Sequence, residues 1–381
     1  MELKLDKSTW KPVTFGDVVQ EVRTTIKDPK GAGVERVVGL EHIETENIHL
    51  RKWTSIEEAT TFTKGFKAGH VLFGRRRAYL KKAAQAEFDG ICSGDITVME
   101  AKDGLLPELL PFLVCNDMFF DHAVKHSAGG LSPRTKFKDL ANFEFLLPPK
   151  DQQAKLAELL WAADAVLEKQ YRQIKVIETL VASYLKEEYQ GHSGPFKKLG
   201  KAGTWKSGGT PSRSNPAFWG GDIPWVSPKD MKVERISNSI EKITQAAVES
   251  RISTLVPNSI LIVIRGLILN HSFPVGITEV EVAFNQDMKA LIVSKDFDPF
   301  YVLYFLQHMK DAVLGMTTTT THGTKRLASD VIFGISLPCP QIAEQRRFTQ
   351  KVETIKVGLN HAIESRASIH QFLKSLINQI F

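Results

Sequence analysis

The stretch LAELLWAADAVLEKQYRQIKVIETLVASY, residues 156–184, decides the fold. Its apolar side chains recur at alternating steps of four and three residues, which is the spacing of a coiled-coil seam. The seam positions are Leu156, Leu160, Ala163, Leu167, Gln170, Ile174, Ile177, Val181 and Tyr184. A helix from about Lys155 to Glu188 would be roughly 50 Å long. Such a helix needs a partner, because it cannot bury its apolar stripe alone.

The stretch FTQKVETIKVGLNHAIESRASIHQFLKSL, residues 348–376, follows the same steps 192 residues later. Its seam positions are Phe348, Val352, Ile355, Leu359, Ala362, Arg366, Ile369, Leu373 and Leu376. We therefore expect the two helices to pair as a coiled coil, in a parallel or an antiparallel arrangement. The helix-pairing candidates are Leu156, Leu160, Leu167, Ile174, Val181, Val352, Leu359, Ile369 and Leu373.

An internal repeat extends over the rest of the chain. Four pairs of residues are separated by 192 positions: Asp95 and Asp287, Pro107 and Pro299, Pro148 and Pro340, and Gln153 and Gln345. Four more are separated by 190: Arg75 and Arg265, Lys136 and Arg326, Phe143 and Phe333, and Leu147 and Leu337. The repeat predicts α/β domains at 1–147 and 191–337, each followed by a helical segment, at 148–190 and 338–381. The expected fold class is α+β.

Apolar and β-branched runs predict strands within both domains. In the first domain they cover residues 35–39, 70–73, 95–99 and 143–147, and in the second 259–264, 289–293 and 331–337. Prolines mark the start of one further helix in each domain, over Glu108–Cys115 and Phe300–Met309. Each domain therefore mixes strands with short helices.

The composition is that of a globular protein. The 381 residues carry 49 Lys and Arg against 43 Asp and Glu, and 43% are hydrophobic, which excludes a disordered chain. The N-terminal sequence MELKLD has charges where an export signal has its apolar core, and Arg265 interrupts the longest apolar stretch. We expect a cytoplasmic protein without membrane contact. Cys92, Cys115 and Cys339 are too far apart for a zinc motif and are expected to be reduced and buried.

The motifs of the common hydrolases, nucleotide triphosphatases and dinucleotide-binding enzymes do not occur in the sequence. The string Asn215-Pro-Ala-Phe218 resembles the Asn-Pro-Pro-aromatic motif of amino-methylating DNA methyltransferases, but Ala217 replaces the second proline. We interpret it as part of a turn-rich loop that includes residues 208–211 and 219–225. Acidic residues such as Asp222, Asp230 and Asp287 are dispersed, so we expect no catalytic residue, no metal and no cofactor.

Basic and polar clusters are the remaining functional candidates. The run Arg75-Arg76-Arg77 follows a predicted strand and could bind phosphates or guanine edges, although a solvated charged face is an alternative. Residues 127–138 align with the threonine-rich segment 317–326, which could also be a flexible loop. The candidate DNA-binding residues are Arg75, Arg76, Arg77, Lys81, Arg134, Lys136, Arg265, Asn270, His271, Thr320, His322, Lys325 and Arg326.

The whole chain resembles the specificity subunit of type I restriction-modification systems. The similarity rests on the repeat, on GGTPSRSNPAFWGGDIPWV at residues 208–226 and on SLPCPQIAEQRR at residues 336–347. The first-half version of the second motif departs from the family pattern, because it has Asp151-Gln152 where Glu-Gln is usual.

This resemblance implies two target-recognition domains that each read one half of a bipartite site in double-stranded DNA. The paired helices would set the spacer between the halves. Two adenine methyltransferase subunits, which supply the S-adenosylmethionine site, and restriction subunits are the implied partners, and the specificity subunit itself does no chemistry. A stand-alone DNA-binding regulator is the alternative, and a methyltransferase would require the isolated chain to bind S-adenosylmethionine.

Overall fold

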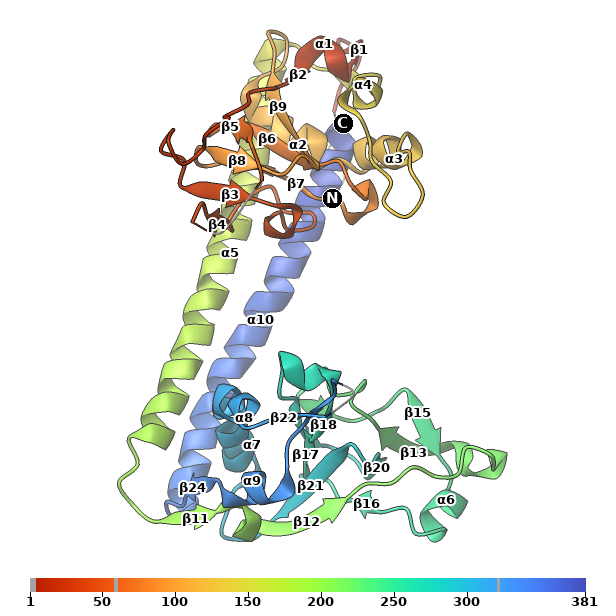
Figure 1. Ribbon diagram of the computed structural model, residues 1–381, viewed down its shortest axis with the longest axis vertical. Coiled ribbons are helices and arrows are strands. Elements are labelled where there is room, and N and C mark those ends of the chain that lie inside the picture. Colours follow the sequence, from red (N-terminus) through yellow and green to blue (C-terminus); the bar gives the residue numbers. More distant parts are fainter. Residues whose placement is uncertain (1–4, 58–60, 321–322) are drawn as a thin grey trace. The chain divides into compact units, whose positions relative to one another are not determined.

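The computed structural model describes residues 5–57, 61–320 and 323–381 (Figure 1). The chain forms two compact units. Unit 1 comprises residues 1–172 and 363–381, and unit 2 comprises residues 173–362. Two long helices, α5 (Lys150–Gln190) and α10 (Ile342–Ile380), each contribute to both units.

The described part of unit 1 contains two four-stranded sheets. The first has the order β2 (Val19–Glu21), β9 (Ile96–Ala101), β6 (Val71–Gly74), β7 (Ala83–Gln85). The second has the order β4 (Thr54–Ser55), β3 (Arg36–Val38), β8 (Gly90–Cys92), β5 (Lys64–Phe66), and β3 and β8 are parallel. Strands β1 (Lys11–Thr14) and β10 (Glu144–Leu147) pair separately. The short helices are α1 (Phe15–Val18), α2 (Leu110–Val114), α3 (Asp117–Lys125) and α4 (Phe137–Leu140).

Unit 2 repeats this arrangement. Its larger sheet has the order β12 (Gly203–Ser207), β21 (Met288–Val293), β17 (Ile260–Val263), β19 (Val275–Thr278), β14 (Arg235–Ile236). The second sheet has the order β15 (Glu241–Ile243), β13 (Trp219–Val226), β20 (Val282–Phe284), β16 (Thr254–Leu255), and β13 and β20 are parallel. The strand order recurs, and the second sheet of each unit contains one parallel pair, so the predicted repeat is confirmed. Unit 2 adds strand β14, which pairs in parallel with β19.

The remaining elements of unit 2 cover its sheets and their edges. A small sheet has the order β18 (Arg265–Gly266), β23 (Lys325–Arg326), β22 (Thr318–Thr319), and β11 (Phe196–Lys198) pairs with β24 (Ser336–Pro338). The helices are α6 (Gln245–Glu249), α7 (Pro299–His308), α8 (Lys310–Gly315) and α9 (Ser329–Gly334).

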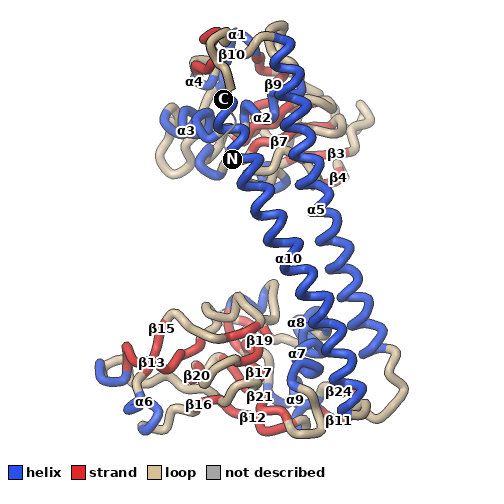
Figure 2. Tube along the Cα trace, turned by 180° about the vertical axis from the view of Figure 1, so that it is seen from behind, coloured by secondary structure: helices blue, strands red, loops and turns tan. Residues whose placement is uncertain are grey.

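Helices α5 and α10 lie side by side in both views (Figures 1 and 2). In unit 1, Leu160 near the start of α5 belongs to the same buried cluster as Leu376 near the end of α10. In unit 2, Tyr184 near the end of α5 stacks on Phe348 near the start of α10, with ring centroids 5.1 Å apart. The predicted pairing is therefore confirmed, and it is antiparallel.

The structure corrects three local predictions. Residues 331–334 belong to helix α9 and not to a strand, and the strand begins only at Ser336, because Ser329 and Asp330 provide a polar first helical turn. The stretch Trp219–Val226 is strand β13 with a bulge and not a loop. All three cysteines are free, but only Cys92 is fully buried. Among the described residues, every helix is too short or too polar to span a membrane.

Candidate nucleic-acid interface

Backbone hydrogen bonds join two distant loops of unit 1 beside the end of strand β6. The amide of Arg75 donates to the carbonyl oxygen of Asp95 (3.0 Å), and the carbonyl oxygen of Arg75 accepts from the amide of Thr135 (2.9 Å). The amide of Arg77 donates to the carbonyl oxygen of Pro133 (2.8 Å). The structure therefore brings the basic run at 75–77 together with the loop that contains Arg134 and Lys136.

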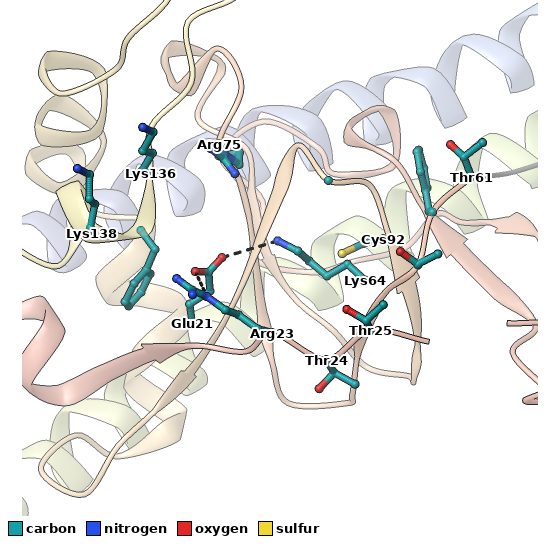
Figure 3. A pocket seen from close by; sticks show the side chains of 14 residues that line it. Glu21, Arg23, Thr24, Thr25, Thr61, Lys64, Arg75, Cys92, Lys136 and Lys138 are labelled. Atoms are coloured by element: carbon teal, nitrogen blue, oxygen red, sulfur yellow. Dashed lines mark hydrogen bonds and ion pairs between the residues drawn. The ribbon is translucent and has the colours of Figure 1, made fainter. Parts of the chain in front are cut away.

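An open hollow of about 730 Å³ lies next to these loops (Figure 3). We call it the basic hollow, because five of its lining side chains are cationic. They are Arg23, Lys64, Arg75, Lys136 and Lys138. The carboxylate of Glu21 also lines it and pairs with Arg23 (2.9 Å) and Lys64 (3.8 Å). The positive charge that remains is suited to a phosphate group.

A carboxylate holds two arginines at the neighbouring edge. Asp95 accepts from Nε (2.6 Å) and Nη2 (3.2 Å) of Arg134, and Nη1 of Arg76 lies 3.5 Å from its Oδ2. The hydrogen bond from Arg134, helped by the nearby charges of both arginines, holds the pKa of Asp95 below its usual value although partial burial opposes this. Backbone pairing places Arg76 opposite Arg134. We call Asp95, Arg76 and Arg134 the unit 1 clamp.

Unit 2 has two arginines and an aspartate at the equivalent place, but its aspartate lies near only one of them. Arg265 of β18 lies opposite Arg326 of β23, and Nη1 of Arg265 lies 3.7 Å from Oδ1 of Asp287. Arg326 is exposed, and among the described residues no ion pair involves its guanidinium. We call Asp287, Arg265 and Arg326 the unit 2 clamp.

Strand register corrects the residue pairs that the repeat predicts here. The sequence pairs Arg75 with Arg265 and Lys136 with Arg326. In the structure, Arg76 opposite Arg134 corresponds to Arg265 opposite Arg326. The first pair slips by one residue and the second by two. A slip of one residue turns a side chain to the other face of a strand, and sequence identity alone does not detect it.

The other candidates of unit 2 lie near the clamp or outside the described residues. Asn270 and His271 are exposed at the end of a short helical turn, Leu267–Asn270. The amide of Thr320 donates to the carbonyl oxygen of Thr324 (2.9 Å), and Lys325 lies opposite Thr319. His322 falls outside the described residues.

Lys81 lies apart from these clusters. Its ammonium group pairs with Asp117 and lies 3.7 Å from Glu46, so neighbouring carboxylates compensate its charge. Asn215 caps a short helical turn, because its Oδ1 accepts from the amide of Ala217 (3.2 Å). In the ranges that the structure describes, no cluster of His, Cys, Asp and Glu could hold a metal ion.

Sequence reasoning missed three cations of the basic hollow: Arg23, Lys64 and Lys138. Arg23 follows strand β2 and Lys64 begins strand β5, so each stands at a strand end. A search for charged residues at the ends of predicted strands would have found Lys64 only if the short strand β5 had been predicted. The run KGF of β5 carries no β-branched residue to indicate it.

Comparisons with known proteins identify relatives of this chain. A family described as "Type I restriction modification DNA specificity domain" matches residues 196–366. The chain is 33% identical over 191 residues to the type I restriction enzyme EcoR124I/EcoR124II specificity subunit of Escherichia coli, a match that covers 48% of this chain and 47% of that protein. The match thus spans about half the length of that relative.

Two solved structures share the fold along nearly the whole chain. One is described as the structural basis underlying complex assembly and conformational transition of the type I R-M system. It has a TM-score of 0.59 and 20% identity, and the match covers 99% of this chain and 98% of that one. The other is the type I restriction-modification system S subunit from M. genitalium, with a TM-score of 0.57 and 14% identity over 100% and 99% of the two chains.

Proposed function

The chain belongs to the specificity-subunit family of type I restriction-modification systems, and from this premise we propose that it selects the DNA site for a methylating and cleaving complex. Each unit reads one half of a bipartite site. The recognition domains are residues 1–147 and 191–337, and the helical segments 148–190 and 338–381 set the spacer. The observation that carries the proposal is the arginine clamp, which recurs at the same edge of two copies of one fold.

In this proposal, different residues contact the phosphates and the bases. The basic hollow of unit 1 binds the DNA backbone, because Lys136 and Lys138 are exposed and form no ion pair within the part of the chain that the structure describes. The clamp arginines can donate two parallel hydrogen bonds to O6 and N7 of guanine. Phosphate contacts supply affinity, and the arginines supply base choice.

The helices also offer surfaces for the partner subunits. In unit 1, α5 exposes 38% of Leu159 and 49% of Val166. In unit 2, the same helix exposes 67% of Val176 and 52% of Leu180. These side chains lie outside the buried seam, and two adenine methyltransferase subunits would cover them. The chain itself is non-catalytic, so the methyl donor binds to those subunits, and restriction subunits add cleavage.

Mapping of adenine methylation across the genome tests the proposal. We expect a bipartite motif in cells that contain this gene and its methylating partner, and loss of that motif when only this gene is deleted. Return of the intact gene should restore the motif. A motif that persists without the gene would contradict the proposal.

Copurification separates this function from a stand-alone regulator. The full chain should copurify with a methyltransferase subunit at an apparent stoichiometry of one to two. Sequence-specific DNA binding by a chain that never associates with a methyltransferase would favour the regulator instead.

A further inference from the structure

Both clamps place a carboxylate next to arginines that face DNA in the proposed function. A carboxylate near a phosphate backbone repels it, so simple electrostatics disfavours an acid at this position. The acid nevertheless occurs in both units, as Asp95 and Asp287, at the same step before the equivalent strands β9 and β21. An acid that recurs in this way, next to two arginines in unit 1 and to Arg265 in unit 2, points to a role that acts through them.

The geometry of the unit 1 clamp specifies that role. Asp95 engages Nε and Nη2 of Arg134, while Nη1 of Arg134 lies 3.4 Å from the carbonyl oxygen of Ser132. Nη2 of Arg76 donates to the hydroxyl of Ser132 (3.2 Å). Both guanidinium groups are thus fixed from the protein side. Arg134 still exposes 45% of its side chain, so a part of its donors can reach a ligand.

Fixing an arginine before binding matters because a free arginine side chain loses much rotamer freedom when it binds. A guanidinium with five donors can satisfy a carboxylate on one edge and still donate from its other edge. The charge that the carboxylate adds is unfavourable for DNA, but the orientation that it imposes favours both affinity and discrimination among bases.

We propose that Asp95 and Asp287 are positioning residues: Asp95 holds both arginines of its clamp, and Asp287 holds Arg265, in the orientation that reads DNA. The inference rests on the proposed function of the two units. Asp95 makes three contacts of 3.5 Å or less with two arginines, whereas Asp287 makes one contact of 3.7 Å with Arg265. Asp95 therefore has the larger effect.

The test replaces Asp95 by asparagine in the full chain, purified with its methyltransferase partners. Asparagine keeps the shape but removes the charge and one acceptor. The control is Asp103→Asn, which removes the same charge from an exposed position in unit 1 for which no ion pair is found among the described residues. Equilibrium binding is measured on a duplex with the mapped motif and on duplexes altered in one half or the other.

Electrostatics alone and the positioning role predict opposite results. If Asp95 only repels DNA, Asp95→Asn binds as tightly as wild type or tighter. We expect it to bind about tenfold more weakly and to discriminate less against changes in one half-site. Asp287→Asn should show a smaller loss that concerns the other half-site. Asp103→Asn should keep wild-type discrimination.

Two outcomes overturn different claims. Tighter or unchanged binding by Asp95→Asn, with wild-type discrimination at both half-sites, would overturn the positioning role while the proposed function stands. If the wild-type complex itself shows no dependence on either half-site, the proposed function fails and the inference fails with it. Thermal unfolding of the variants checks that a weaker complex is not an unfolded one, because an ion pair as exposed as this contributes little to stability.

Discussion

In unit 1 the buried side chain of Gln153 joins three backbone groups, and in unit 2 Gln345 does the same. Gln153 accepts from the amide of Leu106 (2.8 Å) and donates to the carbonyl oxygens of Gly104 (2.8 Å) and Pro148 (2.9 Å). Gln345 makes the equivalent three bonds with Asp298 (2.9 Å), Asp296 (3.0 Å) and Pro340 (2.9 Å). The two units thus share individual hydrogen bonds at the start of helices α5 and α10.

The two units differ at positions outside these shared hydrogen bonds. The strand register places Glu21 opposite Met99 in unit 1 and Trp205 opposite Leu291 in unit 2. An acid that pairs with two cations therefore corresponds to a tryptophan that packs on Phe333. The comparison teaches that the buried polar hydrogen bonds are the same in both units, whereas partly buried positions such as Glu21 and Trp205 differ in their chemistry.

Lysine substitutions in the seam should break one unit at a time and have the largest effect. Leu160 in unit 1 and Val352 in unit 2 are fully buried, in separate clusters. Leu160→Lys and Val352→Lys each bury an unpaired charge and should cost about 4 kcal/mol or more. Hydrogen exchange should rise in the unit that carries the change, and Leu159→Lys is the exposed control. Equal loss of protection in both units from either change would contradict separate cores.

Replacement of Gln153 and of Gln345 by leucine compares the energies of the two hydrogen-bond networks. Gln153→Leu and Gln345→Leu each leave one buried amide and two carbonyl groups without their partner, which should lower the free energy of unfolding by about 3 kcal/mol. Chemical unfolding measures the loss, and Gln350→Leu at an exposed position of α10 is the control. A loss in one unit only would mean that the two networks are equal in geometry but not in energy.

Removal of cations from the basic hollow should affect DNA binding and its salt dependence. Arg75→Ala combined with Lys136→Ala should weaken binding about tenfold or more and lower the slope of log affinity against log salt by about 1.8, because each lost phosphate contact accounts for about 0.9. Lys206→Ala combined with Lys289→Ala removes two cations from the larger sheet of unit 2 and should change the slope less, because both ammonium groups already donate to protein oxygens. Lys81→Ala should leave the slope unchanged, because neighbouring carboxylates already compensate the charge of Lys81.

Two histidines should give the units opposite responses to pH, with the smallest effect. Burial lowers the pKa of His49, but contacts with Asp164 and Glu87 outweigh it, so the pKa is raised. Protonated His49 therefore contributes its full stabilisation to unit 1 below the pKa of about 6.5 that histidine has in the unfolded chain. This stabilisation is lost as the pH rises through the higher pKa of His49 in the folded protein. Burial, followed by the charge of Lys186, lowers the pKa of His308, so unit 2 loses stability as the pH falls below about 6.5.

Thermal unfolding at pH 6 and pH 8 checks these signs. Relative to wild type, His49→Gln should lower the melting temperature more at pH 6, by an amount on the order of 2 °C. His308→Gln should instead improve stability at acidic pH relative to wild type. If both variants changed the melting temperature at pH 6 in the same direction relative to wild type, the direction of one of the two pKa shifts would be wrong.

The sequence predicted the helices and the repeat because both leave periodic or aligned signals. The seam of Leu156 to Tyr184 is a local pattern, and Gln153 and Gln345 align because each lies five residues after a proline. The clamps were only partly predictable. Arg75 and Arg265 align in sequence, yet strand register makes Arg76 the counterpart of Arg265. The basic hollow was not predictable, because Arg23 and Lys136 meet only through long-range folding.

The most direct test of the central claim, that each unit reads its own half-site, is a methylation map of two double variants. Arg76→Ala with Arg134→Ala changes unit 1, and Arg265→Ala with Arg326→Ala changes unit 2. The account predicts that the first pair relaxes the sequence required in one half of the motif and the second pair relaxes the other half, with the spacer unchanged. Relaxation of the same half by both pairs would contradict it.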